Sequence, residues 1–468
     1  MPRIGQPKPE DCQRLRDRIA LGVLTATFPP ELVDQVIERS ARREQRYRLL
    51  PARLVVYYVL AMTLFREAGY EEVLRELTEG LAWASGAAEG LELPSSVAIS
   101  KARARLGPEP LAALFDAGCV PLATPATPGG FYRGWRLVSM DGSTLDTPDT
   151  ADNVATFGKP GSGRGESAFP QLRLVALAEC GTHAMFAAAM GPYTSGEATL
   201  ARKLVGALGP GMLVFADRGF TGHPLFTAFA STGADLCWRA KSNAVLPVLE
   251  RFGDGSFRSE IVATPDKSKR QAVTTVRVVE YELADPGRPQ AEDTTYRLVT
   301  TVLDPEAAPA ADLAGLYAER WEFESALDEL KTHQRGPRVV LRSKTANGIY
   351  QEAWGMLCVH YAIRALICAA ARDGDVDPDR LSFTRAMRAA RRSVRRSSGE
   401  RASLANGLAH ATAEILHELL PHRRLRANPR VVKRKMSKFG VKRAEHRDWP
   451  QPTLTPAQAV RIVGGAST

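Results

Sequence analysis

Residues 136–141 read RLVSMD and residues 212–217 read MLVFAD, two short apolar runs that each end in an aspartate. Short apolar runs bounded by turn material are typical of buried strands. Two more strands are expected between them, QLRLVALAE (171–179) and HAMFAAAMG (183–191), followed by a helix, SGEATLARKLVGALG (195–209). The predicted order is strand, strand, strand, helix, strand, with an acid at the end of the first and of the fourth strand.

This order is the plan of a ribonuclease-H-like core, and its two acids are Asp141 and Asp217. A single aspartate after a strand is usually a turn former or a helix cap. Two at matched positions favour another use, because phosphodiester chemistry needs two divalent ions about 3.5–4 Å apart. Such ions are held by carboxylates that converge from separate elements. We therefore expect Asp141 and Asp217 to be catalytic metal ligands.

A third carboxylate lies in YAERWEFESALDELK, residues 317–331. Tyr317, Arg320, Glu324 and Lys331 are separated by three, four and seven residues, so one continuous helix over 311–332 would place them on one face. That face offers a metal ligand between three groups that can hold phosphate. The alternative is an ordinary amphipathic helix with salt bridges, since the segment is rich in other acids.

The remaining segments predict an α/β protein with three domains. Residues 1–120 show helical periodicity, and residues 131–375 would form the ribonuclease-H-like catalytic domain. Within it, residues 235–303 are rich in β-branched alternation and predict a β-strand insertion before the helix of Glu324. Residues 376–468 are expected to be a helical, basic C-terminal region. A chain of 468 residues is long enough for two or three domains.

Charge and cysteine usage narrow the class of partner. The net charge of +10 favours a polyanion such as nucleic acid or a membrane surface, although a merely basic enzyme would look the same. Six scattered cysteines form no CxxC pair, which argues against a zinc ribbon or a disulfide framework. The first residues lack an apolar signal segment, and the longest apolar stretch, 54–64, is too short to span a bilayer. A cytoplasmic protein with no membrane partner is expected.

Three basic segments are candidates for DNA contact. SSVAISKARARLG (95–107) has a good helix start and a terminating glycine, and it resembles a helix-turn-helix reader; the alternative is a solvated helix of a bundle. Arginines also repeat at helical spacing over 385–396, and residues 422–444 hold ten Lys and Arg and no acid. DNA phosphates would supply the counter-charge, and the alternative is a solvated tail. The individual candidates are Ser100, Lys101, Arg103, Arg105, Lys433, Arg434 and Lys435.

Several motifs together resemble the IS-four family of bacterial insertion-sequence transposases. They are the Tyr-x2-Arg-x3-Glu-x6-Lys pattern with Trp321 inside it, ADRGF around Asp217 and DGSTLDTPDT after a strand. LPARLVVYYVLAMTLFREAGYEEVLREL (50–77) and SSVAISKARARLGPEPL (95–111) resemble the N-terminal domain of that family. NPRVVKRKMSKFGVKR (428–443) resembles its C-terminal tail, so the likeness covers nearly the whole chain.

This resemblance implies a DDE catalytic core with a β insertion, two Mg²⁺ or Mn²⁺ ions, and cut-and-paste movement through a DNA hairpin. It makes Asp141, Asp217 and Glu324 the catalytic metal ligands, and Tyr317, Arg320 and Lys331 contacts to phosphates near the cleaved end. The sequence matches the family pattern at all six positions. The expected partners are terminal inverted repeats and target DNA. Synapsis of two ends implies a homodimer on DNA, in the bacterial cytoplasm and associated with the nucleoid.

Two other functions fit the same residues. One is a catalytically silent DNA-binding regulator descended from a transposase, which the complete triad disfavours. The other is a metal-dependent nuclease of the same fold without strand transfer, which only an assay of DNA joining would separate from a transposase.

Overall fold

The computed structural model describes most of the 468-residue chain. The described residues are 22–46, 48–85, 94–162, 165–220, 222–263, 273–284, 295–336, 340–396, 401–421, 431–432, 440–448 and 454–464. Two compact units interleave in sequence: the first holds Met1–Gly130, Gly142–Gly196 and Glu324–Leu420, the second Phe131–Asp141, Glu197–Phe323 and Pro421–Thr468. Each compact unit is thus built from segments that are distant in sequence. The division into three domains stays a prediction.

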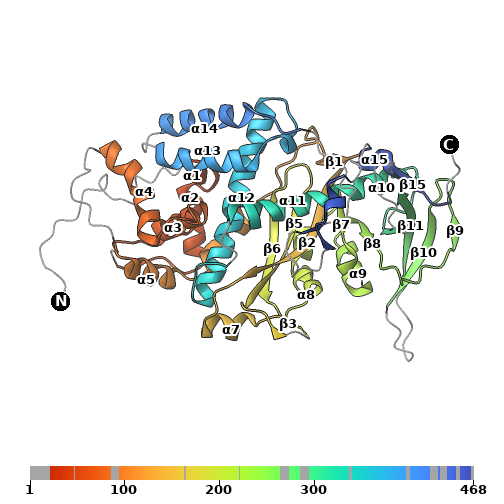
Figure 1. Cartoon of the computed structure of the whole chain (residues 1–468), viewed down its shortest axis with the longest axis horizontal. Helices are drawn as coiled ribbons and strands as arrows, with labels where there is room; N and C mark the ends of the chain where they lie inside the picture. Colours follow the sequence, from red (N-terminus) through yellow and green to blue (C-terminus); the bar gives the residue numbers. More distant parts are fainter. Residues whose placement is uncertain are drawn as a thin grey trace, which may run out of the picture. The chain divides into compact units, whose positions relative to one another are not determined.

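The first unit is mainly helical, as Figure 1 shows, and its N-terminal part confirms the helical region expected there. Its helices are α1 (Val23–Thr27), α2 (Pro30–Arg39), α3 (Ala52–Leu64), α4 (Tyr70–Ser85), α5 (Ser96–Leu106), α6 (Glu109–Gly118), α7 (Ala151–Phe157), α12 (Ala346–Asp373), α13 (Phe383–Arg396) and α14 (Arg401–Leu416), with a short 3-10 turn η7 (Pro378–Arg380). Its strands are β5 (Gln171–Glu179) and β6 (Met185–Pro192), an antiparallel pair that confirms two predicted strands, and the short hairpin β3 (Gly161–Ser162) and β4 (Gly165–Glu166).

Helices α3 and α12 form the core of this unit. Every residue of α3 except Arg53 is buried, as expected for a helix that is apolar all round. A side chain at Gly355 of α12 would bring its Cβ within 3.0 Å of Val59 Cγ1, so glycine permits close packing of the two helices. Helix α12 is long and apolar enough to cross a membrane, but 78% of its most apolar window is buried, which is the behaviour of a core helix.

The second unit is built on a large mixed sheet. Strand β2 (Trp135–Asp146) pairs in parallel with β7 (Met212–Ala216), and β7 pairs in parallel with β8 (Asp235–Arg239). The order continues through antiparallel strands β12 (Tyr296–Thr300), β11 (Val273–Leu283), β10 (Phe257–Val262) and β9 (Glu250–Arg251), with β1 (Phe131–Tyr132) beside β2 and β15 (Val460–Ile462) beside β11. The shorter elements are α8 (Glu197–Ala201), η3 (Arg202–Ala207), η4 (Arg218–Phe220), α9 (His223–Ala230) and α15 (Pro456–Ala459).

Three boundaries differ from the sequence prediction. Strand β2 does not end at Asp141 but continues to Asp146. Strand β8 pairs in parallel with β7 and so belongs to the core, and the inserted strands β9 to β12 extend the edge of the same sheet because β12 returns antiparallel to β8. The C-terminal region is not wholly helical, because β15 adds a strand to β11.

The segment expected as one helix over 311–332 is four helical pieces. They are α10 (Ala310–Leu316), the 3-10 turn η5 (Tyr317–Arg320), α11 (Trp321–Asp328) and the π-helical turn η6 (Glu329–Gln334). A 3-10 turn winds more tightly than an α-helix and a π-helix more loosely. Residue spacing in an ideal α-helix therefore does not fix which of these side chains share a face.

Candidate active site

Asp141 and Asp217 follow the last paired residues of two adjacent parallel strands. The register between β2 and β7 matches Arg136 with Met212 and ends with Met140 opposite Ala216, so the next residue on each strand is an aspartate. Neighbouring strands lie about 4.8 Å apart, and residues in register point to the same face of a sheet. The two carboxylates therefore start from adjacent points and leave the sheet on one face.

The local structure around Asp217 keeps its carboxylate close to the backbone of the following turn. Asp217 comes directly after β7, as predicted, and its Oδ1 accepts a hydrogen bond from the Gly219 amide at 2.7 Å. A Cβ at position 219 would lie 2.9 Å from that same oxygen, so a larger residue there would displace the carboxylate. Asp217 is half-buried, which leaves part of the carboxylate accessible.

Arg320 lies against Asp141. Its Nη1 donates to Asp141 Oδ2 at 3.3 Å, and only 7% of the arginine surface is exposed. A guanidinium held in a partly buried site retains a strong field because little water screens it. The structure thus places the predicted phosphate contact beside the predicted metal ligand within the second unit.

Tyr317 does not have the placement expected of a phosphate contact. The side chain is 4% exposed, its hydroxyl donates to the Ala216 carbonyl at 3.3 Å, and burial raises its pKa far above the usual value. Its ring packs edge-on against Phe215. This geometry supports β7 just before Asp217, so Tyr317 positions the strand end and is not available at the surface.

Glu324 and Lys331 lie on later pieces of the same helical segment. Glu324 is exposed on α11, and its role as a metal ligand stays a prediction. Lys331 lies in η6, and its Nζ donates to Ser143 Oγ at 2.8 Å. Ser143 is two residues beyond Asp141 on β2, so both side chains point to the same face of that strand. Sequence reasoning missed Ser143, because a serine in a strand carries no signal without its partner.

The surroundings of Lys331 are basic. Burial lowers the pKa of Lys331 and the nearby Arg335 lowers it further, while Asp146 partly opposes both. Burial likewise lowers the pKa of Arg335, and its Nε is buried without a hydrogen-bond partner among the described residues. Asp146 itself accepts a hydrogen bond from Gln171 Nε2 at 2.7 Å. Two cations near one acid leave a net positive site, which suits an anion such as phosphate.

The residues of helix α5 that were predicted to contact DNA differ in their exposure. Ser95 caps the helix by accepting from the Ala98 amide, and Gly107 ends it at a φ of 72°. Ser100, Lys101 and Arg105 are exposed, whereas Arg103 is 5% exposed. The Arg103 guanidinium donates to Gln351, Ser343, Tyr70 and the Gly348 carbonyl. Arg103 is therefore an internal anchor to α12, a placement that does not support its prediction as a DNA contact.

A basic hollow adjoins the end of α5. It has a volume of about 390 Å³, and its lining includes Arg42, Arg43, Arg46, Arg48 and Arg105, with Glu44 as the one acid. Arg42 pairs with Glu109 at 3.1 Å and Arg43 with Glu38 at 3.4 Å, while Arg46 and Arg48 have no ion pair with any residue that the structure describes. The sequence ARREQRYR at 41–48 was the signal that could have found this cluster.

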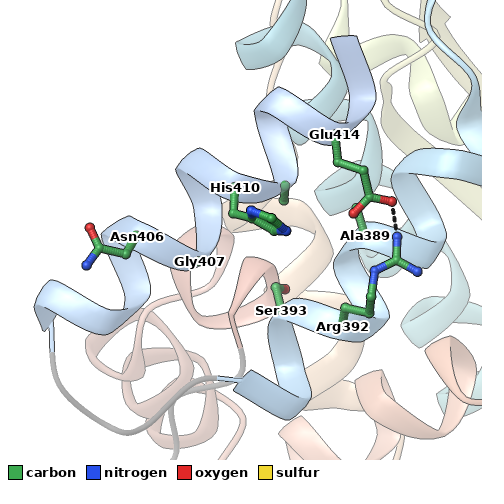
Figure 2. Close-up of a pocket in the computed structure, with 8 residues that line it drawn as sticks. Ala389, Arg392, Ser393, Asn406, Gly407, His410 and Glu414 are labelled. Carbon is green, nitrogen blue, oxygen red and sulfur yellow. Dashed lines mark hydrogen bonds and ion pairs between the residues drawn. The ribbon is translucent and has the colours of Figure 1, made fainter. Parts of the chain in front are cut away.

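The arginine-rich helix α13 is less open than its sequence indicated. Arg392 pairs with Glu414 of α14 across a hollow of about 240 Å³ (Figure 2). Arg385 pairs with Glu418, and Arg391 Nε donates to the Leu64 carbonyl at 2.9 Å. Acids of the protein itself therefore balance part of the positive charge of α13 that DNA phosphates were expected to balance. Lys433, Arg434 and Lys435 lie outside the described residues.

Two family models of transposases match the chain. The family described as "Insertion element 4 transposase N-terminal" matches residues 18–116, and "Transposase DDE domain" matches residues 133–361. The second match defines the class: the chain is a DDE transposase, an enzyme that cleaves DNA and transfers strands. The match to the DDE domain also implies that the enzyme depends on a divalent metal ion.

Two relatives from Escherichia coli (strain K12) narrow the class. "Transposase InsG for insertion sequence element IS4" is 27% identical over 414 residues, which are 88% of this chain and 91% of the relative. "Putative transposase InsZ" is 24% identical over 212 residues, 45% of this chain and 68% of the relative. The chain belongs to the insertion element 4 family of transposases, as its motifs indicated.

A solved structure also resembles the chain. It is described as a "piggyBac transposase synaptic complex with hairpin DNA", is 13% identical, covers 89% of this chain and 88% of its own, and has a TM-score of 0.42. The match to the DDE domain and the mixed sheet confirm the predicted fold class, an α/β protein with a ribonuclease-H-like core and a β insertion after a helical N-terminal region.

Proposed function

We propose that this transposase cuts the terminal inverted repeats of its own element with two divalent ions and joins the freed 3′-hydroxyl to target DNA. The observation that carries the proposal is the register of β2 and β7, which places Asp141 and Asp217 side by side on one face. Carboxylates spaced by one strand separation suit hard cations about 3.5–4 Å apart. Glu324, exposed on α11 of the signature segment, is proposed as the third ligand.

The donor set fits magnesium or manganese better than a softer metal. Asp141, Asp217 and Glu324 offer only carboxylate oxygens, which are the ligands of hard cations, and no cysteine or histidine is among them. When bound, the two ions would activate the attacking hydroxyl and stabilise the charge on the leaving oxygen.

The protein's own residues would then hold the DNA backbone for attack. Arg320 lies against Asp141 and can turn part of its guanidinium to a phosphate oxygen. Lys331, held by Ser143, adds a point charge on the same face of β2. Tyr317 holds the strand end that precedes Asp217. These residues bind and orient, which is the main protein contribution to phosphoryl transfer.

We further propose the exposed face of α5, with Ser100, Lys101 and Arg105, and the adjoining basic hollow as contacts to duplex DNA. The hollow brings five arginines together with one acid, a charge ratio that attracts phosphates. A hairpin intermediate, a homodimer in the synaptic complex and association with the bacterial nucleoid are the finer parts of the proposal, and family membership supports them.

The experiment uses purified full-length protein and a duplex that carries the end of its own element, with the flanking DNA attached. With Mg²⁺ we expect nicking at the element end and, with target DNA, a joined product; with EDTA we expect neither. Cleavage that never yields a joined product would favour a nuclease. DNA binding without cleavage in Mg²⁺ or Mn²⁺ would indicate the silent regulator, and both results overturn the proposal.

A further inference from the structure

A buried carboxylate lies between two residues of the family signature, because Glu329 is only 8% exposed. Glu329 stands five residues after Glu324 and two before Lys331, at the start of the π-helical turn η6. Its Oε1 is 3.2 Å from His183 Nδ1 and accepts from Arg364 Nη1 at 3.4 Å, while its Oε2 is 3.2 Å from His360 Nε2. Both oxygens are therefore engaged, which fixes the orientation of the carboxylate.

The partners of Glu329 come from two other elements. His360 and Arg364 are one turn apart on α12, the core helix. His183 lies in the turn between β5 and β6 with a φ of 56°, an uncommon conformation for a residue other than glycine. The same turn is tied to α12, because Arg364 Nε donates to the Thr182 carbonyl at 2.6 Å. The cluster thus anchors η6 to the sheet and to the core.

A charge in this place is costly unless it is paired. Burial alone would raise the pKa of Glu329, but Arg364, His183 and His360 outweigh burial and hold its pKa well below the usual range. Removing one partner from such a pair leaves an uncompensated buried charge. The cluster consequently tolerates little displacement of the helical turn that carries Glu329.

The turn that Glu329 starts also decides where Lys331 points. A π-helix bonds residue i to i+5, so the chain rotates less per residue than in an α-helix. Lys331 is therefore turned away from the position that seven residues of α-helix would give it relative to Glu324. In the observed position its Nζ reaches Ser143 Oγ at 2.8 Å.

We propose that Glu329 is a positioning residue for DNA cleavage, whose buried carboxylate fixes the π-helical turn that presents Lys331 to Ser143. The inference rests on the proposed function, because Lys331 matters to the reaction only if it holds DNA phosphate. In this role Glu329 would contact neither DNA nor metal and would act through Lys331.

A double-mutant cycle on the full-length protein tests this action. Glu329→Gln keeps the shape and removes the charge, and we expect it to lower the rate of end cleavage at saturating DNA and Mg²⁺ at least tenfold. In a Lys331→Ala background the same change should cost less than twofold, because the lysine is already lost. Equal losses in both backgrounds would overturn the proposal, as would an unchanged rate in folded Glu329→Gln.

A charge-balanced variant separates positioning from simple stability. Glu329→Gln with Arg364→Gln removes both charges, so it should recover the melting temperature lost by Glu329→Gln but not its cleavage rate. Recovery of both would show that charge balance alone was needed and would refute positioning. The comparison also holds if Glu329→Gln alone fails to fold, since the double variant is then compared with wild type.

The matched control is Glu414→Gln, the same chemical change in the ion pair between Glu414 of α14 and Arg392 of α13, which should leave the cleavage rate unchanged. Absence of Mg²⁺-dependent cleavage by the wild-type protein would instead refute the proposed function. Failure of the inference and failure of the function are therefore distinguishable.

Discussion

The charges around Glu329 and those around Asp217 are arranged in opposite ways. Glu329 is enclosed, and each of its oxygens faces a histidine or arginine of the same compact unit. Asp217 is half-buried, and its hydrogen bond comes from a backbone amide in the next turn. Among the described residues it has no ion pair. A carboxylate whose partners are all internal supports the fold, whereas one that keeps free acceptor capacity can bind something else.

The largest effect on DNA cleavage should follow from neutralising the partly exposed carboxylate of Asp217. Asp217→Asn should reduce Mg²⁺-dependent end cleavage about a thousandfold or more, because loss of a metal ligand removes several kcal/mol of transition-state stabilisation. Its unfolding free energy should stay within about 0.5 kcal/mol of wild type. Chemical denaturation and a cleavage time course on the same preparation measure both, and a stable variant with wild-type cleavage would break the comparison.

Removing the enclosed carboxylate should act first on stability. Glu329→Ala should lower the free energy of unfolding by about 3–5 kcal/mol, because buried Arg364 loses the nearer of its two acids and keeps only Asp379 at 4.0 Å. Urea denaturation followed by circular dichroism gives the value. The comparison would be wrong if this variant were as stable as Asp217→Asn.

Lys331 lies between these two extremes, since it is half-buried in a basic site. Burial and Arg335 lower its pKa, so its charge is lost at a lower pH than for a free lysine as the pH rises. Cleavage should therefore decline on the alkaline side, and Lys331→Arg should move that decline to higher pH because arginine keeps its proton. Rates measured from pH 7 to 10 test the shift; an alkaline limb that is the same in both proteins would contradict it.

The smallest effects are expected for the arginines of the basic hollow that have no ion pair among the described residues. Arg46→Ala with Arg48→Ala should weaken binding of random duplex DNA and reduce the slope of log affinity against log salt by about 0.9 for each lost phosphate contact. Removal of two exposed arginines elsewhere, Arg75→Ala with Arg258→Ala, is the charge-matched control. Fluorescence anisotropy at several salt concentrations measures both, and equal slopes would remove the hollow from the DNA interface.

Some features of the site could be predicted because they are local. A short apolar run predicts a buried strand, and an acid directly after it marks the end of that strand. The sequence therefore predicted that Asp217 directly follows β7. The helical N-terminal region and the strands β5 and β6 follow from periodicity in the same way. Asp141 was expected at a strand end, but β2 runs on to Asp146: its pairing with β7 stops at Met140, and its other neighbour in the sheet is β5.

Other features could not be predicted because they depend on partners distant in sequence. Arg103 looked like a surface residue of a basic helix, yet Gln351 and Ser343 bury it. Glu329 looked like one more acid on an acidic helix, yet His183, His360 and Arg364 enclose it. The one-face pattern from Tyr317 to Lys331 assumed a uniform α-helix, and the 3-10 and π turns change it.

The sequence by itself determined the class of this protein. The catalytic signature and the periodicity of the elements around it are local patterns, formed by residues close together in the sequence. Only the tertiary structure decided which charges are enclosed and which stay open. Burial and ion pairing arise from contacts between segments far apart in the chain, and the free energy of a charge depends on that surrounding rather than on its neighbours in sequence.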